Sequence, residues 1–505
     1  MSSVELYPTS PKNVLSQYIG KSIRDVPTPA AVINVAAIRR NCERMLQTCD
    51  KLGLDWRAHV KTHKTVEVTE FQVGNDAKRP VNLIVSTLAE AEFLLPRLKE
   101  YRSQGRQVNV LYGLPIPQNA MSRLAAVAKA LGEGSVSILL DDPAQIPIIS
   151  NFQSLSGVVP HAHIKIDMGG KRAGVEAQSA RFLELADVAL EAHSQGKIRL
   201  SGLYSHAGHS YGGDSRAAAI KMMRAEISAM LEGADRLTSR AAEKSVANLP
   251  PLVVSAGASP TSLAVQNLVT TSEEAQETIP AELKSEVQAL SDLFGTVRGK
   301  GHLVEIHAGV YPTLDLQQLA AHSISASRLS WGDIALTVLA EVHSNYPGRG
   351  ANGTPEALIG SGGIALARET CKAYEGMAMM TPWGRKDVDL PTCDVEDFRG
   401  WIVGRFSQEH GILTWRSGNA KTEPVQPDQE LPKVGEKVRL WPNHACITSS
   451  HFGWYFVVDE DEAGKEDVIV DIWIKCRGCR DLGNDPHVTA QADMTGHPHE
   501  LKTKN

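Results

Sequence analysis

The feature that most constrains this chain is an alternation of short apolar runs with longer stretches at helical spacing, from about Ala30 to Ile306. Short apolar runs bounded by turn residues predict buried strands, and stretches such as "SARFLELADVALEAHSQG" predict the helices between them. Repeated strand–helix units place parallel strands side by side under a layer of helices. The candidate strands are "AAVINV", "RAHVK", "NLIVS", "VNVLYG", "SVSILL", "HIKIDM", "RLSGLYSH", "LVVSAG" and "LVEIHAG".

Eight parallel strands close into a barrel, so nine candidates are one too many, and one of them is expected to be peripheral or not a strand. A doubly wound open sheet is the alternative. No glycine-rich dinucleotide fingerprint follows the first candidate strand, which disfavours the open sheet. The prediction is an α/β chain in which a (β/α)8 TIM-type barrel is followed by a mostly antiparallel β domain.

Changes in local composition and residue pattern suggest where these units begin and end. Residues 1–27 form an N-terminal segment that we expect to pack on the β domain, and residues 28–325 form the barrel. An acidic, helical stretch at about 265–300 is longer than an ordinary connection and is interpreted as an insertion. Residues 326–482, with short runs such as "KVRLWPNH", form the β domain, and the polar tail 483–505 is expected to be disordered.

Composition excludes several classes of partner. A net charge of −6 and a pI near 6.3 give no basic surface for nucleic acid. No apolar run approaches the roughly 20 residues that a membrane helix needs. The seven scattered cysteines do not form a disulfide framework, and their odd number fits a reducing compartment. We therefore expect a cytoplasmic enzyme with a small-molecule substrate.

Polar groups gather at the ends of the predicted strands, where barrel enzymes place their chemistry. "DWRAHVKTHKT" supplies Lys61 and His63, and "SAGASPT" and "HAGVY" supply glycines and hydroxyls near two later strand ends. Alternation along the first of these places His59, Lys61 and His63 on one polar face. A lysine opposite loops that can bind phosphate through backbone N–H groups suggests pyridoxal phosphate, whose aldehyde forms a Schiff base with lysine. Taken alone, such glycine–serine loops are more often plain turns.

Longer motifs carry a family resemblance. "AAVINVAAIRRNCERM…RAHVKTHKT" and "IKIDMGGKRAGV" resemble the barrel of the alanine-racemase-like, fold-type III pyridoxal phosphate enzymes. "GLYSHAGHSY", "ALARETC", "SQEHGIL" and above all "WPNHACITSSHFGWYFVVD" resemble the eukaryotic-type, zinc-dependent D-serine dehydratases. The resemblance extends from roughly Thr28 to Arg480. It implies a homodimeric lyase that converts D-serine to pyruvate and ammonia with pyridoxal phosphate and zinc.

The resemblance also implies roles for individual residues. Lys61, which follows Val60 at the strand end, would carry the cofactor and act as the catalytic base, in preference to Lys64. The remaining cofactor contacts would come from Tyr204, Tyr211, Ser259, Gly309, Val310 and Arg172. Two positions depart from the family pattern, because Val310 stands where asparagine is more usual and Ala258 where serine is expected. Backbone donors survive either change, whereas a side-chain contact could be lost.

The same resemblance assigns zinc to His444 and Cys446 of the "PNHAC" segment. On a strand, a spacing of two would place both side chains on one face. A thiolate with an imidazole favours zinc, and two protein ligands leave positions open for water and substrate. The alternative is a strand end with a buried cysteine and an incidental histidine. The "CRGC" motif has no second cysteine pair, so a structural zinc site there is not expected.

Other activities stay open at this stage. The chain could be another β-hydroxy D-amino acid lyase: a D-threonine or D-threo-3-hydroxyaspartate dehydratase, or a D-threonine aldolase. Related aldolases typically carry aspartate in the position of Cys446, so the cysteine favours a dehydratase. A non-catalytic cofactor carrier is disfavoured by the β domain, and a racemase by the lack of a matching C-terminal tyrosine motif. The sequence does not decide whether His59, His63, His206 and His209 touch the site.

Overall fold

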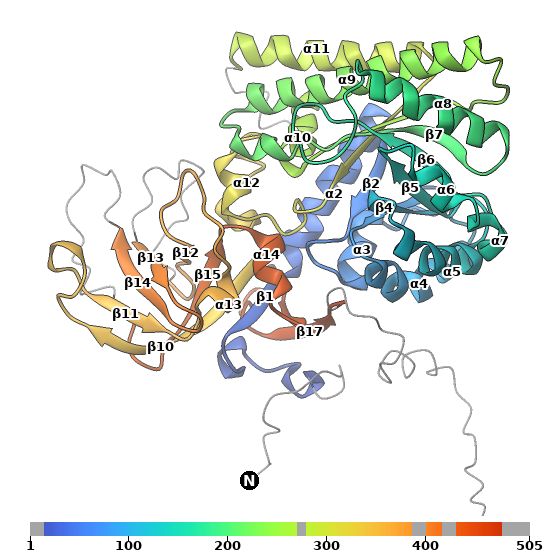
Figure 1. Ribbon diagram of the computed structural model, residues 1–505. Helices are drawn as coiled ribbons and strands as arrows, with labels where there is room; N and C mark the ends of the chain where they lie inside the picture. The colour runs from blue at the N-terminus through green and yellow to red at the C-terminus, as the bar shows by residue number, and fades with distance from the viewer. Residues whose placement is uncertain (1–14, 270–278, 386–399, 417–430, 477–505) are drawn as a thin grey trace, which may run out of the picture.

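The computed structural model describes residues 15–269, 279–385, 400–416 and 431–476 (Figure 1). Eight parallel strands form a closed barrel, in which the last strand pairs with the first. The strands are β2 (Asp55–His59), β3 (Val81–Val85), β4 (Val108–Pro115), β5 (Val136–Leu140), β6 (His161–Lys165), β7 (Arg199–Tyr204), β8 (Val253–Ala256) and β9 (Leu303–Ala308). The predicted barrel is confirmed.

Helices cover the outside of the barrel, and their starts follow from capping residues in the sequence. Thr65 accepts a hydrogen bond at the start of α3, Thr87 at α4 and Ser179 at α8, which satisfies N–H groups that a helix end leaves free. The helices are α2 (Val35–Leu52), α3 (Val66–Val73), α4 (Leu88–Ser103), α5 (Met121–Leu131), α6 (Gln145–Ile149), α7 (Phe152–Ser156), α8 (Ala180–Ser194), α9 (Arg216–Glu243) and α10 (Ser259–Ala264).

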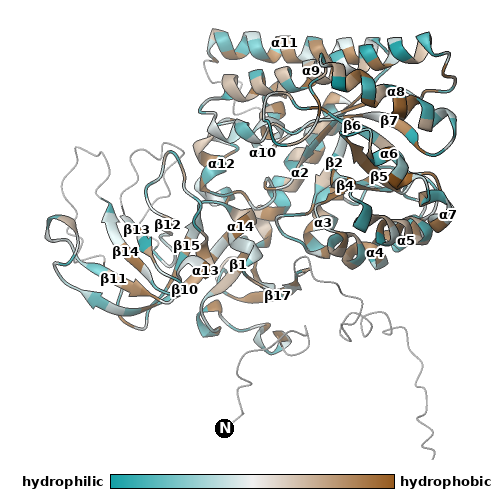
Figure 2. Cartoon of the chain, in the orientation of Figure 1, coloured by the Kyte–Doolittle hydropathy of each residue, from teal (hydrophilic) through white to brown (hydrophobic). Residues whose placement is uncertain are grey.

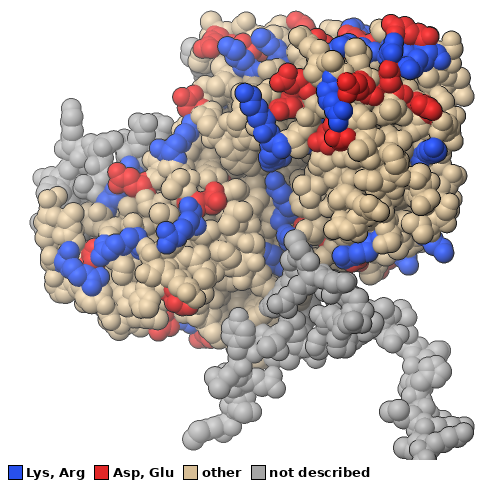
Figure 3. Space-filling view, viewed as in Figure 1, with Lys and Arg blue, Asp and Glu red and all other residues tan. Residues whose placement is uncertain are grey.

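The predicted insertion contributes α11 (Ala281–Gly299), which packs along α9 on the outside of the barrel (Figure 1). Hydrophobic residues, brown in Figure 2, concentrate on the barrel strands and on the inner sides of these helices. Acidic and basic side chains are interspersed over α8, α9 and α11 on the face shown in Figure 3. Among the helices that the structure describes, none is long and apolar enough to cross a membrane.

In the described residues, the second unit is a nine-stranded, mostly antiparallel sheet with strand order β11-β14-β13-β12-β15-β10-β1-β16-β17. An additional pairing of β10 with β11 curls part of it into a small barrel. The strands are β10 (Leu336–Tyr346), β11 (Glu356–Ile359), β12 (Ala378–Met380), β13 (Gly400–Phe406), β14 (Gly411–Arg416), β15 (Lys437–Pro442), β16 (Trp454–Val458) and β17 (Ile469–Ile474). The predicted β domain is confirmed.

The ninth candidate strand is β1 (Ala30–Asn34), which belongs to this second sheet and not to the barrel. It pairs antiparallel with β10 and parallel with β16, so the chain passes through the β domain before α2 leads into the barrel. Leu15, Tyr18, Ile23 and Val26 of the preceding segment pack on the same sheet. The predicted disordered tail lies outside the described residues.

Candidate active site

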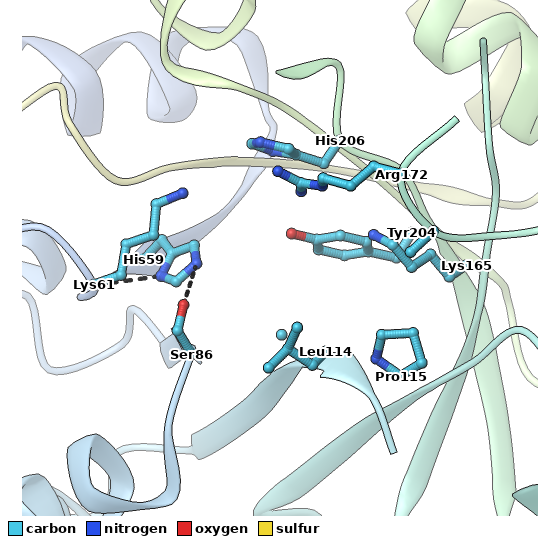
Figure 4. A pocket seen from close by; sticks show the side chains of 11 residues that line it. His59, Lys61, Ser86, Leu114, Pro115, Lys165, Arg172, Tyr204 and His206 are labelled. Atoms are coloured by element: carbon cyan, nitrogen blue, oxygen red, sulfur yellow. Dashed lines mark hydrogen bonds between the residues drawn. The ribbon is translucent and has the colours of Figure 1, made fainter. Parts of the chain in front are cut away.

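A cavity of about 300 Å³ opens at the carboxyl ends of the barrel strands (Figure 4). Its lining includes His59, Lys61, Lys165, Arg172, Tyr204 and His206, which lie at or just beyond the ends of β2, β6 and β7. Three of these side chains are cationic, and no carboxylate lines the cavity. The cavity therefore suits a ligand that carries negative charge, such as a phosphate or an amino acid carboxylate.

Lys61 reaches into the cavity from the turn that follows β2 (Figure 4). Its backbone N–H donates to His59 Nδ1 at 3.4 Å, and His59 Nε2 lies 3.4 Å from Ser86 Oγ. Lys64 takes another direction, because its Nζ forms an ion pair with the buried Glu90 at 2.9 Å. The structure thus places Lys61, and not Lys64, in the cavity.

The expectation that His63 shares a face with His59 and Lys61 is wrong. The strand ends at His59, so the alternation does not continue through the turn. His63 is fully buried beneath it, where Gln72 and Thr65 contact its two ring nitrogens at 2.9 and 3.1 Å. Burial lowers the pKa of His63 to about 3, which keeps the ring neutral.

Lys165 was not predicted as a site residue, yet it ends β6 and lines the cavity beside Arg172 and Tyr204. Burial, followed by the nearby charge of Arg172, lowers the pKa of Lys165 to about 8. Its Nζ lies 4.7 Å from the centre of the Tyr204 ring, which stacks on His307 at 4.4 Å. Its place at the end of β6 was the one signal in the sequence, but that signal alone does not separate a lysine in the cavity from an exposed one.

The two loops expected to bind phosphate meet beside this cavity. The Val310 N–H donates to Ser259 Oγ at 3.0 Å, and a side chain at Gly309 would lie 3.3 Å from His59 Cβ. Gly257 has a φ of +152°, and a Cβ there would lie 2.0 Å from the His307 carbonyl oxygen. Only glycine fits so close an approach of two strand ends. Ser259 and the backbone at 309–310 therefore form a crowded corner beside His59, where the predicted phosphate contacts lie together.

Tyr211 links this corner to the predicted metal ligands. Its hydroxyl is hydrogen-bonded with Ser259, and its ring centre lies 6.1 Å from that of His444. Burial, followed by the charge of Cys446, raises the pKa of Tyr211 well above its ordinary value. The residue stays a neutral phenol that can donate a hydrogen bond.

His444 and Cys446 lie together, but the predicted reason is wrong. Strand β15 ends at Pro442; His444 is the N-cap of the short helix α14 (Ala445–Ser450), and Cys446 lies in its first turn. Burial alone would raise the pKa of the Cys446 thiol, but the hydrogen bond with His444 and the charge of Lys61 lower it below its ordinary value. Against the effect of burial, the same hydrogen bond and Asp315 raise the pKa of His444 to about 9.

A polarised thiol beside an imidazole matches the ligand chemistry of zinc. Glu369 Oε2 lies 3.4 Å from His444 Nδ1, and this contact helps to fix the orientation of the imidazole ring. Within the described ranges, no group of three or more histidine, cysteine, aspartate or glutamate side chains is arranged to hold a metal ion. The pair fits an open site with two protein ligands.

The pair of candidate metal ligands contacts the turn that carries Lys61 through Cys446. Thr62, the residue after Lys61, has its Oγ1 2.9 Å from Cys446 Sγ. The predicted residues therefore form three adjoining groups: Lys61, Arg172 and Tyr204 in the cavity, Ser259, Gly309, Val310 and Tyr211 beside it, and His444 with Cys446 next to the lysine turn. His59 and His206 also line the cavity.

An alanine-racemase-like barrel with a lysine at the end of its first strand, joined to a β domain, defines the class of fold-type III pyridoxal phosphate enzymes. Two family models match: "alanine racemase, N-terminal domain" over residues 33–273 and "putative serine dehydratase domain" over residues 335–458. Among curated proteins, the chain is 35% identical to D-serine dehydratase of Schizosaccharomyces pombe, over 92% of this chain and 94% of that protein.

It is also 32% identical to D-serine dehydratase of Saccharomyces cerevisiae, over 92% of this chain and 98% of that protein. The chain belongs to the D-serine dehydratase family. A solved relative is D-threo-3-hydroxyaspartate dehydratase from Delftia sp. HT23, with a TM-score of 0.65 and 25% identity over 90% of this chain and 99% of that one. A cysteine-to-alanine mutant of a D-threo-3-hydroxyaspartate dehydratase, solved in the metal-free form, matches equally well, with a TM-score of 0.65 and 25% identity.

Proposed function

We propose that this protein dehydrates D-serine to pyruvate and ammonia, with pyridoxal phosphate on Lys61 and zinc on His444 and Cys446. The observation that carries the proposal is the contact of Thr62 with Cys446, which places the candidate metal pair beside the turn of the candidate cofactor lysine. The two D-serine dehydratases above support the substrate, and the relative solved in a metal-free form supports a metal-dependent family member.

Each residue has a chemical task in this proposal. When bound, pyridoxal phosphate supplies a sink for the electrons left at the substrate Cα. The Lys61 amine lies in the cavity and takes the Cα proton. Lys165 and Arg172 attract and orient the substrate carboxylate. Zinc on the thiolate–imidazole pair supplies a Lewis acid for the β-hydroxyl, a poor leaving group on its own.

A second candidate is dehydration of D-threo-3-hydroxyaspartate. The Delftia enzyme with that activity is 28% identical over 86% of this chain. Lys165 and Arg172 are two cations besides Lys61, enough to pair with two substrate carboxylates. The homodimer and the cytoplasmic location stay predictions of the resemblance and of the composition.

Product identification with three substrates tests the function. The purified protein is incubated with D-serine, D-threonine and D-threo-3-hydroxyaspartate, and the keto acids, ammonia, glycine and aldehydes are measured. The proposal expects pyruvate and ammonia from D-serine at the highest kcat/KM. Faster formation of oxaloacetate from hydroxyaspartate would favour the second candidate, and glycine with an aldehyde would identify an aldolase.

A further inference from the structure

The turn that carries Lys61, residues 61–64, is bonded to the β domain at each residue after the lysine. The Thr62 carbonyl accepts from Ser449 Oγ at 2.6 Å, and the His63 carbonyl accepts from the Tyr455 hydroxyl at 3.2 Å. The Lys64 carbonyl accepts from the Cys476 N–H at 2.8 Å. Three successive carbonyls of one barrel turn are thus satisfied by groups more than 380 residues away in the chain.

The barrel itself fixes this turn only in part. The Lys64 N–H donates back to the Val60 carbonyl at 2.9 Å, and Lys64 adopts a positive φ of 56°, which side chains other than glycine rarely adopt. Thr62 and His63 are fully buried, and unpaired carbonyls there would be costly. A turn with an uncommon backbone conformation is stable only when neighbouring groups hold it in place. Here the neighbouring groups that bond to the turn belong to the β domain.

The donors of these bonds are themselves held in place. Lys475 Nζ donates to the Ser449 carbonyl and lies 4.7 Å from the centre of the Tyr455 ring. Ser449, Tyr455 and Lys475 are all buried. Ser449 shares α14 with Cys446, and Figure 1 shows α14 at the junction of the barrel with the β domain. One short helix therefore contacts the lysine turn through a candidate metal ligand and through a separate hydroxyl.

We propose that Ser449 and Tyr455 are positioning residues for Lys61: their hydroxyls hold the carbonyls of Thr62 and His63 and so fix where the lysine amine stands in the cavity. The proposal rests on the proposed function, in which Lys61 carries the cofactor. Neither hydroxyl touches the cavity, so their effect reaches the reaction through the backbone of the turn. A misplacement of a reacting group by about 1 Å, caused by a change far from the chemistry, can slow a reaction about a hundredfold.

The test uses Ser449→Ala and Tyr455→Phe, which each remove one donor. The matched control is Ser450→Ala, in the same helix, whose hydroxyl donates to the Ile447 carbonyl and not to the turn. Five properties are measured in the full-length protein: the rate at which apoprotein captures added pyridoxal phosphate, the pH titration of the bound cofactor's absorbance, the kcat and KM for D-serine, the zinc content and the thermal midpoint. Borohydride reduction followed by peptide mapping identifies the lysine that carries the cofactor.

We expect both variants to capture the cofactor more slowly than the parent protein and to show a shifted absorbance titration. Their turnover of D-serine should fall about tenfold with little change in KM, because loss of a single neutral hydrogen bond corresponds to about that factor. Zinc content stays at the parent level, and Ser450→Ala behaves as the parent protein. The positioning role would be overturned if both variants captured the cofactor at the parent rate and showed the parent's absorbance titration. If the cofactor still mapped to Lys61, the proposed function would be unaffected by that result. A cofactor mapped to another lysine would overturn both.

Discussion

Lys61 and Lys64 are three residues apart, but only Lys61 has its side chain in the cavity, because Lys64 is paired with Glu90 at 2.9 Å. We expect Lys61→Ala to lose the visible absorbance of lysine-linked pyridoxal phosphate and to lose turnover by at least a factor of about a thousand. Lys64→Ala should keep both and lose some stability, because it leaves Glu90 without its ion partner in the interior. An unchanged cofactor spectrum in Lys61→Ala would contradict the assignment.

Lys165 gives the site a pH dependence whose sign follows from its environment. Burial and Arg172 lower its pKa to about 8, so the amine is charged below that pH and neutral above it. We expect the KM for D-serine to rise as the pH increases through about 8, because the substrate carboxylate loses a partner.

The matched variants for this prediction are Lys165→Gln, which is never charged, and Lys165→Arg, which is charged throughout. Lys165→Gln should show a raised KM, by roughly tenfold, already at low pH, and Lys165→Arg should not show the rise near pH 8. The substrate's own amine titrates equally in all three proteins. Parallel KM profiles for the parent protein and Lys165→Gln would exclude Lys165 from substrate binding.

Cys446 can be tested by metal content, independently of turnover. Cys446→Ala should lose bound zinc and D-serine dehydration while keeping the cofactor absorbance. Cys371→Ala is the control, because Cys371 is another half-buried thiol whose Sγ donates to the Leu316 carbonyl at 3.6 Å. Full zinc content in purified Cys446→Ala would mean that the metal binds elsewhere.

At the residue scale, the sequence predicted one lysine of the cavity, Lys61, but not Lys165. Lys61 could be predicted because a family motif ends at that position. Lys165 was missed although it lies in a quoted motif, because nothing local distinguishes a strand-end lysine in a cavity from an exposed one. The place of His63 depends on where β2 ends, and a propensity pattern does not fix a strand end to one residue.

At the scale of elements, α14 depends on Asp315, which precedes α12 (Leu316–Ala320). Asp315 Oδ1 accepts from the Gln318 N–H at 2.9 Å, and Oδ2 accepts from the Ala445 N–H at 2.8 Å. One carboxylate thus caps α12 and fixes the backbone between His444 and Cys446. We expect Asp315→Ala to lower the free energy of unfolding by about 1–3 kcal/mol and to weaken zinc retention.

Ser179→Ala is the control for a lost cap, because Ser179 accepts from the Phe182 N–H at the start of α8, on the outside of the barrel. It should lower the thermal midpoint without releasing zinc. If Asp315→Ala lost stability to the same extent as Ser179→Ala and kept its zinc against a competing chelator, Asp315 would have no role at the metal pair.

The wrong expectation that His444 and Cys446 lie on one face of a strand also concerns secondary-structure elements. A spacing of two predicts a shared face on a strand, whereas β15 ends before His444 and a helix begins. The two side chains still meet, because an N-cap and the first helical turn can point the same way. The two residues therefore lie together as predicted, although the periodicity argument for it was wrong, and their role as metal ligands stays a prediction.

At the scale of the whole molecule, the barrel could be predicted because each of its strands is a local apolar run followed by a local helix. The placement of β1 could not, since its partners β10 and β16 lie about 300 and 420 residues further along the chain. The bonds from Ser449 and Tyr455 to the lysine turn are equally long-range. The contacts between the two domains, where the candidate site is completed, could therefore not be predicted from the sequence.

The central claim is that one site, built from both domains, dehydrates D-serine with a cofactor on Lys61 and a metal on His444 and Cys446. The most direct test is to measure pyruvate formed from D-serine by the purified protein as isolated, after chelation and after addition of zinc, while the cofactor absorbance is recorded. The account predicts that pyruvate formation is lost on chelation and restored by zinc, with the absorbance retained throughout. Undiminished pyruvate formation in the chelated, zinc-free protein would contradict it.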